Sequence, residues 1–127
     1  MDDCPFCHPG ADRVFHEGLH VLGLWDGFPL SPGHALVVPR RHVADWTETS
    51  PDERRELLEA IDVVRSTILD NHRPDGFNVG MNLGEAAGQT VPHLHLHVIP
   101  RYRGDVADPR GGVRWVLPER AAYWSDE

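Results

Sequence analysis

Three of the chain's nine histidines, His93, His95 and His97, stand at alternate positions in "VPHLHLHVIPR", residues 91–101. Near neutral pH an imidazole can act as a nucleophile, a general base or a metal ligand. Strict alternation with apolar residues predicts a β-strand, whose successive side chains point to opposite faces. We therefore expect the three imidazoles on one face, about 6.5–7 Å apart. The intervening apolar side chains would enter a core on the other face: Leu94, Leu96 and Val98.

Two interpretations of this row involve no covalent intermediate. The histidines could be surface positions of an edge strand, although three in register with apolar partners are difficult to reach by chance. They could also serve metal catalysis, because two histidines two positions apart on a strand can share one ion. The first and third histidines lie too far apart to bind one ion together. A metalloenzyme of this kind would also need a glutamate shortly after the pair, and "VIPRYRG", residues 98–104, contains none.

The third interpretation is nucleophilic catalysis by one imidazole with its neighbours as supports. A neutral ring nitrogen can attack phosphorus and form a covalent intermediate. This requires a hydrogen bond that fixes the tautomer, donors around the phosphoryl oxygens and a proton source for the leaving group. His95 is the natural nucleophile, because it has another histidine on each side.

Length and charge limit the class of protein. The 127 residues are enough for one domain with a hydrophobic core. The net charge of −8, from 20 acidic and 12 basic residues, offers no broad basic face to nucleic acid or to an anionic membrane. No apolar run of 18 residues occurs, and the start "MDDCPFCHPG" lacks the pattern of a signal sequence. These features predict a soluble cytoplasmic protein.

The two cysteines, Cys4 and Cys7, form a C-x-x-C pair near the start of the chain. In a reducing compartment this spacing indicates metal or redox chemistry rather than a structural disulfide. The two thiolates could hold a structural zinc ion together with two histidines in tetrahedral geometry. His8 and His16 are the candidates nearby in the sequence, and a pair of free thiols is the alternative.

Several segments have the patterns of regular structure that could position these groups. Strands are expected at residues 19–25, 34–39 and 77–83 and in the histidine stretch, and the last two would form an antiparallel hairpin. A helix is expected after Ser50, with Pro51 in its first turn and Glu53 completing a capping box. Its apolar residues recur at helical spacing: Leu57, Leu58, Ile61, Val64, Ile68 and Leu69. One long helix with several antiparallel strands predicts an α+β domain.

The stretch "HLHLHVIP" resembles the H-x-H-x-H-x-x pattern, with apolar x, of the histidine triad superfamily. Residues 32–42, "PGHALVVPRRH", and 82–101, "NLGEAAGQTVPHLHLHVIPR", resemble blocks of that family in the same order. The resemblance covers most of residues 4–101 of a single domain spanning 1–127, and is greatest to the branch that includes diadenosine polyphosphate hydrolases and histidine-triad nucleotide-binding proteins. It implies an antiparallel sheet of about five strands with one long helix packed on it.

This resemblance implies roles for the histidines. His95 would attack the α-phosphate of a nucleotide, and water would then release the nucleoside monophosphate from the covalent intermediate. His97 would contact a phosphate oxygen and the leaving-group side. His34, in "PGH", matches a fourth histidine that packs beneath the triad and joins its hydrogen bonds. A satisfied core histidine is the alternative for His34, and the two interpretations overlap.

The same resemblance implies substrate contacts. Asn82, Gln89 and Thr90 fall where the family binds phosphate, and Gly88 would let the backbone approach closely. By itself "GEAAGQT" would more often be a turn.

The nucleoside is expected to meet three further residues. Asp26 falls where the family places a residue on the ribose hydroxyls, although an isolated "DG" would be only a turn. Leu24 and Phe6 are candidates for the apolar slot that holds the base, and either could equally be a core residue.

For the metal, the resemblance favours His42 and His93 as partners of the cysteine pair. His93 would then anchor the strand through zinc, while His95 would remain available for chemistry. If His93 does not bind a metal, its role returns to orienting His95. No organic cofactor is implied, and divalent ions could accompany the substrate's phosphates.

The tail, residues 102–127, departs from the pattern of the family. Arg110 and Arg114 could reach a polyphosphate, and three aromatic residues could close over a leaving group: Trp115, Tyr123 and Trp124. Surface arginines and a packed tryptophan are the alternative.

Together these features predict a homodimeric hydrolase, whose sheet would extend across a two-fold axis as in its relatives. It would cleave a purine dinucleotide polyphosphate or a nucleoside phosphoramidate at the α-phosphate. One alternative is nucleotidyl transfer or phosphorolysis, with an acceptor other than water. Another is a nucleotide-binding module without turnover.

Overall fold

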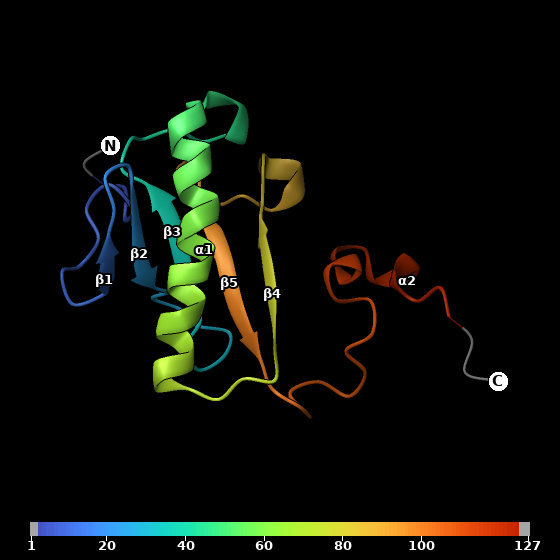
Figure 1. Cartoon of the computed structure of the whole chain (residues 1–127). Helices are drawn as coiled ribbons and strands as arrows, with labels where there is room; N and C mark the ends of the chain where they lie inside the picture. Colours follow the sequence, from blue (N-terminus) through green and yellow to red (C-terminus); the bar gives the residue numbers. More distant parts are fainter. Residues whose placement is uncertain (1–2, 125–127) are drawn as a thin grey trace.

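The computed structural model describes residues 3–124, which form an antiparallel sheet of five strands in the order β1-β2-β3-β5-β4. One long helix, α1, lies across one face of this sheet (Figure 1). The strands are β1 Val14–Glu17, β2 Val21–Trp25, β3 Ala35–Pro39, β4 Gly76–Met81 and β5 Leu96–Arg101. The helices are α1 Pro51–Asn71 and the four-residue α2 Pro118–Ala121, with 3-10 turns at Trp46–Glu48, Glu85–Ala87 and Gly112–Val116. The predicted α+β class is confirmed.

The predicted strands agree with β2, β3 and β4 to within a few residues, and β4 pairs with β5 in antiparallel register as expected. β5 begins only at Leu96, so that residues 82–95 form a connection longer than that of a tight hairpin. The sequence analysis missed β1, a half-buried strand of four residues. Its register against β2 shifts between Val14 and His16. A strand of four residues with such an irregularity shows no clear alternation of apolar and polar residues, so its sequence does not identify it.

The start of α1 forms as its sequence predicts. Ser50 Oγ accepts the Glu53 backbone N–H at 3.1 Å, and Glu53 Oε1 accepts the Ser50 backbone N–H at 2.8 Å. Both halves of the capping box are therefore present, with Pro51 in the first helical position. At the other end the His72 backbone N–H donates to Ile68 O. Within the described residues 3–124, no helix is long and apolar enough to cross a membrane.

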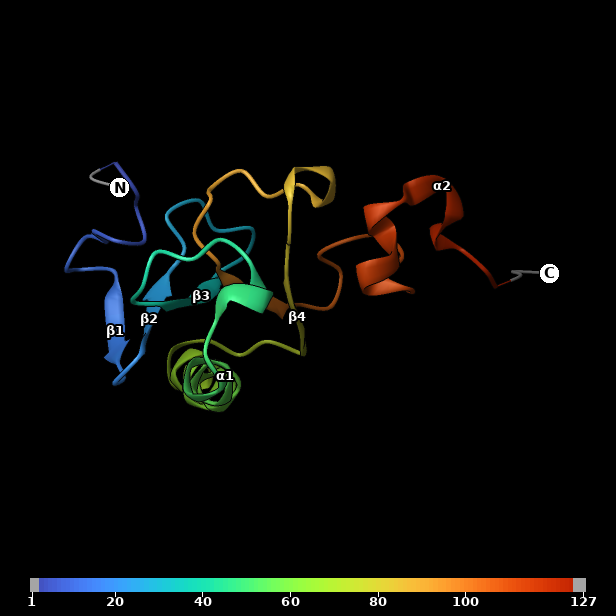
Figure 2. The same cartoon turned by 90° about the horizontal axis from the view of Figure 1, so that it is seen from above.

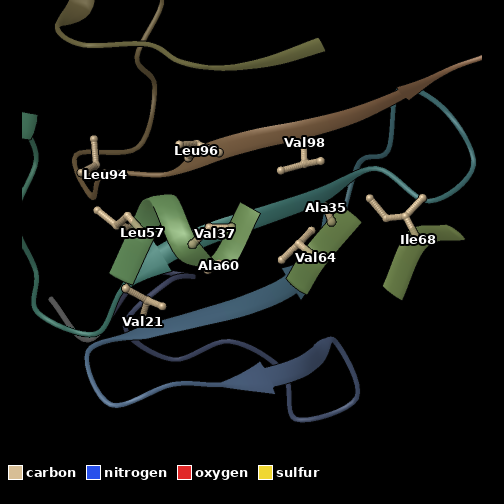
Figure 3. Close-up of a cluster of buried hydrophobic side chains, with 10 residues drawn as sticks. All are labelled: Val21, Ala35, Val37, Leu57, Ala60, Val64, Ile68, Leu94, Leu96 and Val98. Carbon is tan, nitrogen blue, oxygen red and sulfur yellow. The ribbon is translucent and has the colours of Figure 1, made fainter. Parts of the chain in front are cut away.

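The main core lies between α1 and the sheet (Figure 3). Leu94, Leu96 and Val98 are all buried in it, which confirms the alternation read from the sequence. Burial of one such side chain contributes about 1.5–3 kcal/mol. The histidines between these residues therefore take the opposite face. Residues from α1, β2 and β3 complete the cluster: Val21, Ala35, Val37, Leu57, Ala60, Val64 and Ile68.

The face opposite α1 carries a second apolar cluster and the connections around it. Figure 2 shows α1 on one side of the sheet, with the N-terminal segment and the connection before β5 on the other side. Beyond β4, on the side away from β1, lies the tail with α2. The helix thus covers one face and leaves the other available for a site. The second cluster consists of Cys4, Phe6, Leu22, Leu24, Leu36 and Val38.

Glu53 is expected to make stability depend on pH. Arg41 donates from Nε and Nη2 to its two carboxylate oxygens at 3.0 and 2.8 Å, which lowers the pKa of Glu53 from 4.5 to about 2. Because the folded pKa lies below the unfolded one, this stabilisation is present above pH 4.5 and is lost as the pH falls toward 2. We expect Glu53→Gln to lower the free energy of unfolding at pH 7 by about 1–3 kcal/mol.

Urea denaturation of both proteins at pH 7 and near pH 2.5 measures this difference, which should shrink in acid. Asp52→Asn is the matched control, because Asp52 is exposed and pairs with the exposed Arg55. It should change stability by less than about 0.5 kcal/mol. A Glu53→Gln deficit of equal size at both pH values would contradict the assignment.

Candidate active site

The three histidines of the row lie on the sheet face opposite α1. His97 belongs to β5, whereas His93, at a bend, and His95 precede the strand. The Leu94 backbone N–H donates to Val43 O at 2.7 Å, which holds this stretch beside the segment that follows β3. His93 is fully buried, His95 is 9% exposed and His97 is half-buried. The row thus runs from the interior toward a cavity.

His95 has a defined tautomer. Its Nδ1 lies 2.9 Å from the carbonyl oxygen of His93. Because a carbonyl oxygen can only accept, Nδ1 carries the proton and Nε2 keeps its lone pair. The ring packs against Phe6, with centroids 4.8 Å apart, and lines a cavity of about 380 Å³. His95 therefore has the form that nucleophilic attack requires.

His97 has the opposite arrangement, because a chain of hydrogen bonds sets its tautomer. The Leu30 backbone N–H donates to His34 Nδ1 at 3.0 Å, so the proton of His34 is on Nε2. His34 Nε2 lies 2.9 Å from His97 Nδ1 and donates to it, which leaves the proton of His97 on Nε2. Asp26 Oδ2 is a second, more distant neighbour of His34 Nε2, at 3.4 Å.

Burial keeps this second pair of rings uncharged. It lowers the pKa of His97 to about 4, with smaller contributions from His95 and His34. It also lowers the pKa of His34, and the charge of Asp26 opposes that shift. In the tautomers that these hydrogen bonds set, the adjacent rings present a lone pair on His95 and an N–H donor on His97, with ring centroids 5.1 Å apart. A phosphoryl group between them could be attacked by one and receive a hydrogen bond from the other.

The cavity contains most of the residues that the sequence predicts for the site. Asp26 and Phe6 line it, and Gly88 has a φ of +94°, a conformation that favours glycine. Asn82 and Thr90 also line it, from either end of the connection that carries Gly88. The histidines His34, His95 and His97 complete this group.

Two of the predicted substrate-binding residues lie outside the cavity lining. Leu24 is fully buried in the second apolar cluster, behind the wall to which Phe6 and Leu36 contribute. Gln89 holds the loop together instead, because its Oε1 accepts the Gly84 backbone N–H and its Nε2 donates to Ala44 O, both at 2.9 Å. Gln89 therefore positions its neighbours at the cavity.

Arg13 is a residue of this cavity that the sequence analysis did not single out. It is the one arginine or lysine among the lining residues within the described chain. Its Nε donates to Trp25 O at 3.0 Å, and the guanidinium lies beside Gly27. In the sequence, Arg13 could have been linked to the site only through its place directly before β1, and the sequence analysis did not predict that strand. The other lining residues that the sequence analysis did not assign to the site are Pro5, Gly27, Phe28, Leu30, Leu36 and Val91.

The cysteine pair meets His42 and His93 on the inner side of the row. Within this group, Nδ1 of His93 lies 3.4 Å from Cys4 Sγ, 3.5 Å from Cys7 Sγ and 3.2 Å from His42 Nδ1. Cys7 Sγ is 3.2 Å from His42 Nδ1, and all four donor atoms lie within 4.8 Å of one another. His8 and His16, the candidates closer in sequence, are not members of this group.

Four of these separations, 3.2–3.5 Å, are close to those of ligands around one tetrahedral ion. Metal–ligand bonds of about 2.0–2.3 Å place tetrahedral donors about 3.3–3.8 Å apart. His93 Nε2 lies 2.8 Å from Pro39 O and so carries the proton. The lone pair of His93 Nδ1 is then available to a metal ion. The same residue gives its carbonyl oxygen to His95, so His93 joins the cysteine–histidine group to the row.

The chain is similar to two proteins whose names state an activity. A phosphorylase of Mycobacterium tuberculosis, named AP-4-A phosphorylase, is 40% identical over 93 residues, 72% of this chain and 48% of that protein. Bis(5'-adenosyl)-triphosphatase of Saccharomyces cerevisiae is 33% identical over 94 residues, 73% of this chain and 46% of that protein. This chain thus spans about half the length of these two relatives.

Proteins of similar size match as well. An uncharacterized HIT-like protein of Methanocaldococcus jannaschii is 42% identical over 95 residues, 73% of this chain and 71% of that protein. A crystal structure of a HIT family protein from Bacillus anthracis has a TM-score of 0.74 and 35% identity, covering 82% of this chain and 77% of that chain. A Zn-bound histidine triad family protein from Mycobacterium smegmatis has a TM-score of 0.73 and 34% identity, covering 84% and 81%.

The model of the HIT domain matches residues 10–104, which include the row, His34 and β1 to β5. The match covers most of the chain and stops within the loop that follows β5. With the similarity to these relatives, it shows that this chain belongs to the HIT domain family, whose members include histidine triad proteins.

Proposed function

We propose that the protein is a nucleotide hydrolase that cleaves a dinucleotide polyphosphate or a nucleoside phosphoramidate at the α-phosphate. One observation carries this proposal: His95 Nδ1 donates to the His93 carbonyl oxygen at 2.9 Å, which leaves Nε2 as the unprotonated nitrogen of a ring lining the cavity. A neutral nitrogen held in one tautomer is an effective nucleophile toward phosphorus.

In the first step, His95 Nε2 bonds to the α-phosphorus while the bond from phosphorus to the leaving oxygen or nitrogen breaks. His97 Nε2–H keeps its proton and donates a hydrogen bond to a phosphoryl oxygen; a nucleotide leaves as its anion, whereas an amidate nitrogen takes its proton from solvent. Water then attacks the nucleotidyl-histidine, the phosphorus–nitrogen bond breaks, and a nucleoside monophosphate is released. His34 maintains the tautomer of His97 throughout, because its Nε2 lies 2.9 Å from His97 Nδ1.

The cavity lining contains groups that could bind the phosphate, the ribose and the base of the substrate. Asn82, Thr90 and the backbone of Gly88 offer polar groups for the phosphate. Asp26 would accept from the ribose hydroxyls, and its Oδ1 is steadied by the Phe28 backbone N–H at 2.7 Å. Phe6 provides an apolar surface for the base, while Leu24 packs behind that surface.

The relatives favour diadenosine polyphosphates as the substrate class, because one is named a bis(5'-adenosyl)-triphosphatase and another an AP-4-A phosphorylase. The second name supports one alternative function. Inorganic phosphate, in place of water, would attack the nucleotidyl-histidine and yield a nucleoside diphosphate. The same first step serves both outcomes.

We also propose that Cys4, Cys7, His42 and His93 hold one structural zinc ion. The donor set and its separations support this, and a similar structure is described as Zn-bound. Such an ion would tie the N-terminal segment to the ends of β3 and β5, at a distance from the reacting phosphorus. It would add stability to the fold through its ligands.

We further propose a homodimer in which the sheet continues across a two-fold axis at β4. β1 and β4 are the two edges of the sheet, and β4 is the longer one, with Val79 40% exposed in its middle. An open edge strand presents unpaired backbone groups that a second copy can bond.

Replacement of His95 tests the covalent step. His95→Ala should reduce kcat for diadenosine triphosphate by at least about 1000-fold, because no other lone pair in the row is in position. An acid quench of the unaltered protein with labelled substrate should trap a nucleotidyl adduct on His95. His20→Ala, outside the cavity lining, is the control and should retain full turnover. Normal turnover by His95→Ala would refute the mechanism, and an ADP product formed only with added phosphate would identify a phosphorylase.

Metal content tests the zinc site. Elemental analysis of protein expressed with zinc should give about one ion per chain, and Cys4→Ser should lose most of it together with several degrees of Tm. His8→Ala and His16→Ala are matched controls that should keep the ion, because neither belongs to the group. Equal zinc in Cys4→Ser and the unaltered protein would exclude this ligand set.

The association state tests the dimer. Sedimentation should give twice the 14.3 kDa mass of one chain. Val79→Arg should shift the protein toward monomer, because it brings two like charges together near the axis. Leu58→Arg, at a position 54% exposed on α1, should leave the mass unchanged. A monomer at all concentrations would rule the dimer out.

A further inference from the structure

Arg13 brings a positive charge to the cavity that the proposed chemistry does not use. Its Nε–H donates to Trp25 O at 3.0 Å, and the Trp25 backbone N–H donates to Arg13 O at 2.9 Å. The backbone N–H of Arg13 also donates to Gly10 O at 3.0 Å. Among residues 3–124, no oxygen atom or aromatic ring pairs with the terminal nitrogens of Arg13, Nη1 and Nη2. The side chain is therefore held at Nε, while its two terminal amino groups are available to a ligand.

The absence of a side chain at position 27 leaves room for this guanidinium. A Cβ atom on Gly27 would lie 3.4, 3.5 and 3.6 Å from Cζ, Nη1 and Nη2 of Arg13. Because these distances are nearly equal, Gly27 lies over the face of the planar group and not at its edge. The edge that carries the Nη1–H and Nη2–H donors stays open. It suits a ligand that approaches in the plane of the guanidinium and accepts two hydrogen bonds.

The place of Arg13 in the cavity corresponds to the base of a bound nucleotide. In a nucleotide the ribose follows the α-phosphate, and the base follows the ribose. With the phosphoryl group between His95 and His97 and the ribose at Asp26, the base reaches the part of the wall that follows Asp26 in the chain. That part is Gly27, with the guanidinium of Arg13 against it.

The charges around Arg13 favour an uncharged acceptor over a second phosphate. The carboxylate of Asp26 lines the same cavity, and its residue directly precedes Gly27. A phosphate bound at Arg13 would be repelled by this carboxylate and by the net charge of −8 on the chain. A carbonyl oxygen and a ring nitrogen of a base accept hydrogen bonds without that repulsion.

The purine bases differ at the edge that such a donor pair would meet. Guanine presents two acceptors there, O6 and N7, and a guanidinium binds both at once. Adenine presents one acceptor, N7, beside the N6 amino group, whose hydrogens would face those of the guanidinium. A fixed guanidinium therefore discriminates between the two purines.

We propose that Arg13 binds O6 and N7 of the base and gives this protein a preference for guanine nucleotides over adenine nucleotides. Phe6 contacts the face of the base, while Nη1–H and Nη2–H of Arg13 donate to its edge. This assignment rests on the proposed function, because His95 and Asp26 set the direction of the nucleotide. It replaces adenine, the base in the name of one relative, by guanine.

The binding of three purine monophosphates to the unaltered protein, measured by calorimetry, tests the assignment. GMP and IMP share O6 and N7, whereas IMP lacks the exocyclic amine of GMP. Both should bind about ten-fold more tightly than AMP. Arg13→Gln should reverse this order, because a glutamine amide pairs with N6 and N7 of adenine. Arg73→Gln makes the same change of charge at an exposed residue outside the cavity lining and should keep the order.

Hydrolysis of the 5'-phosphoramidates of guanosine and adenosine gives a second measurement that involves no second base. The unaltered protein should favour the guanosine compound about ten-fold in kcat/KM. Arg13→Lys keeps the charge but loses the planar pair of donors, so it should narrow the ratio. This variant also serves if Arg13→Gln does not fold.

A preference for GMP that IMP does not share would mean that the exocyclic amine is recognised, and it would overturn the role of Arg13. Equal binding of all three nucleotides, or no binding, would overturn it as well. If adenosine 3',5'-bisphosphate binds more tightly than GMP and Arg13→Gln removes that difference, Arg13 binds a second phosphate instead. The expected order of binding without turnover of either amidate would support Arg13 and refute the proposed hydrolase.

Discussion

The hydrogen bond from His95 Nδ1 to the carbonyl oxygen of His93 is the constraint on which the rest of the site depends. It decides which ring nitrogen keeps a lone pair, and so it turns an ordinary imidazole into a candidate nucleophile. The carbonyl itself is held in place from several sides. The side chain of His93 is fixed between Pro39 O and the cysteine pair, and the next residue, Leu94, bonds to Val43. The cysteine–histidine group is therefore linked to the tautomer of His95 through the backbone of His93.

The fold imposes this constraint because one face of the sheet packs against α1 and the other face carries the histidines. Leu94, Leu96 and Val98 pack against α1, and their burial sets the orientation of the residues between them. A shift of register by one position would turn the histidines into the core and the leucines toward the cavity. The burial that stabilises the domain thus also selects the face on which the imidazoles stand. Stability and site geometry have the same origin here.

The local parts of this arrangement could be predicted from the sequence, and the long-range parts could not. Alternation around His95 predicted both faces, and Ser50 with Glu53 predicted the start of α1, because each depends on residues a few positions apart. Arg13 and the internal bonds of Gln89 depend on segments brought together only by the fold. Leu24 shows the same limit, since a buried wall and a cavity lining have the same apolar composition. The resemblance to a known family supplied the cysteine–histidine grouping, which spacing alone left open.

The loop around Gly88 has a consequence for how tightly a ligand could be held. The side-chain amide of Gln89 already hydrogen-bonds to Gly84 and to Ala44, so the loop is held in shape before any ligand binds. Little backbone conformational entropy would then be lost when an anion binds. The loss of such entropy often weakens binding. Preorganisation of this kind favours association without a slow closing motion. Rapid exchange of product for substrate would then be compatible with a well-ordered pocket.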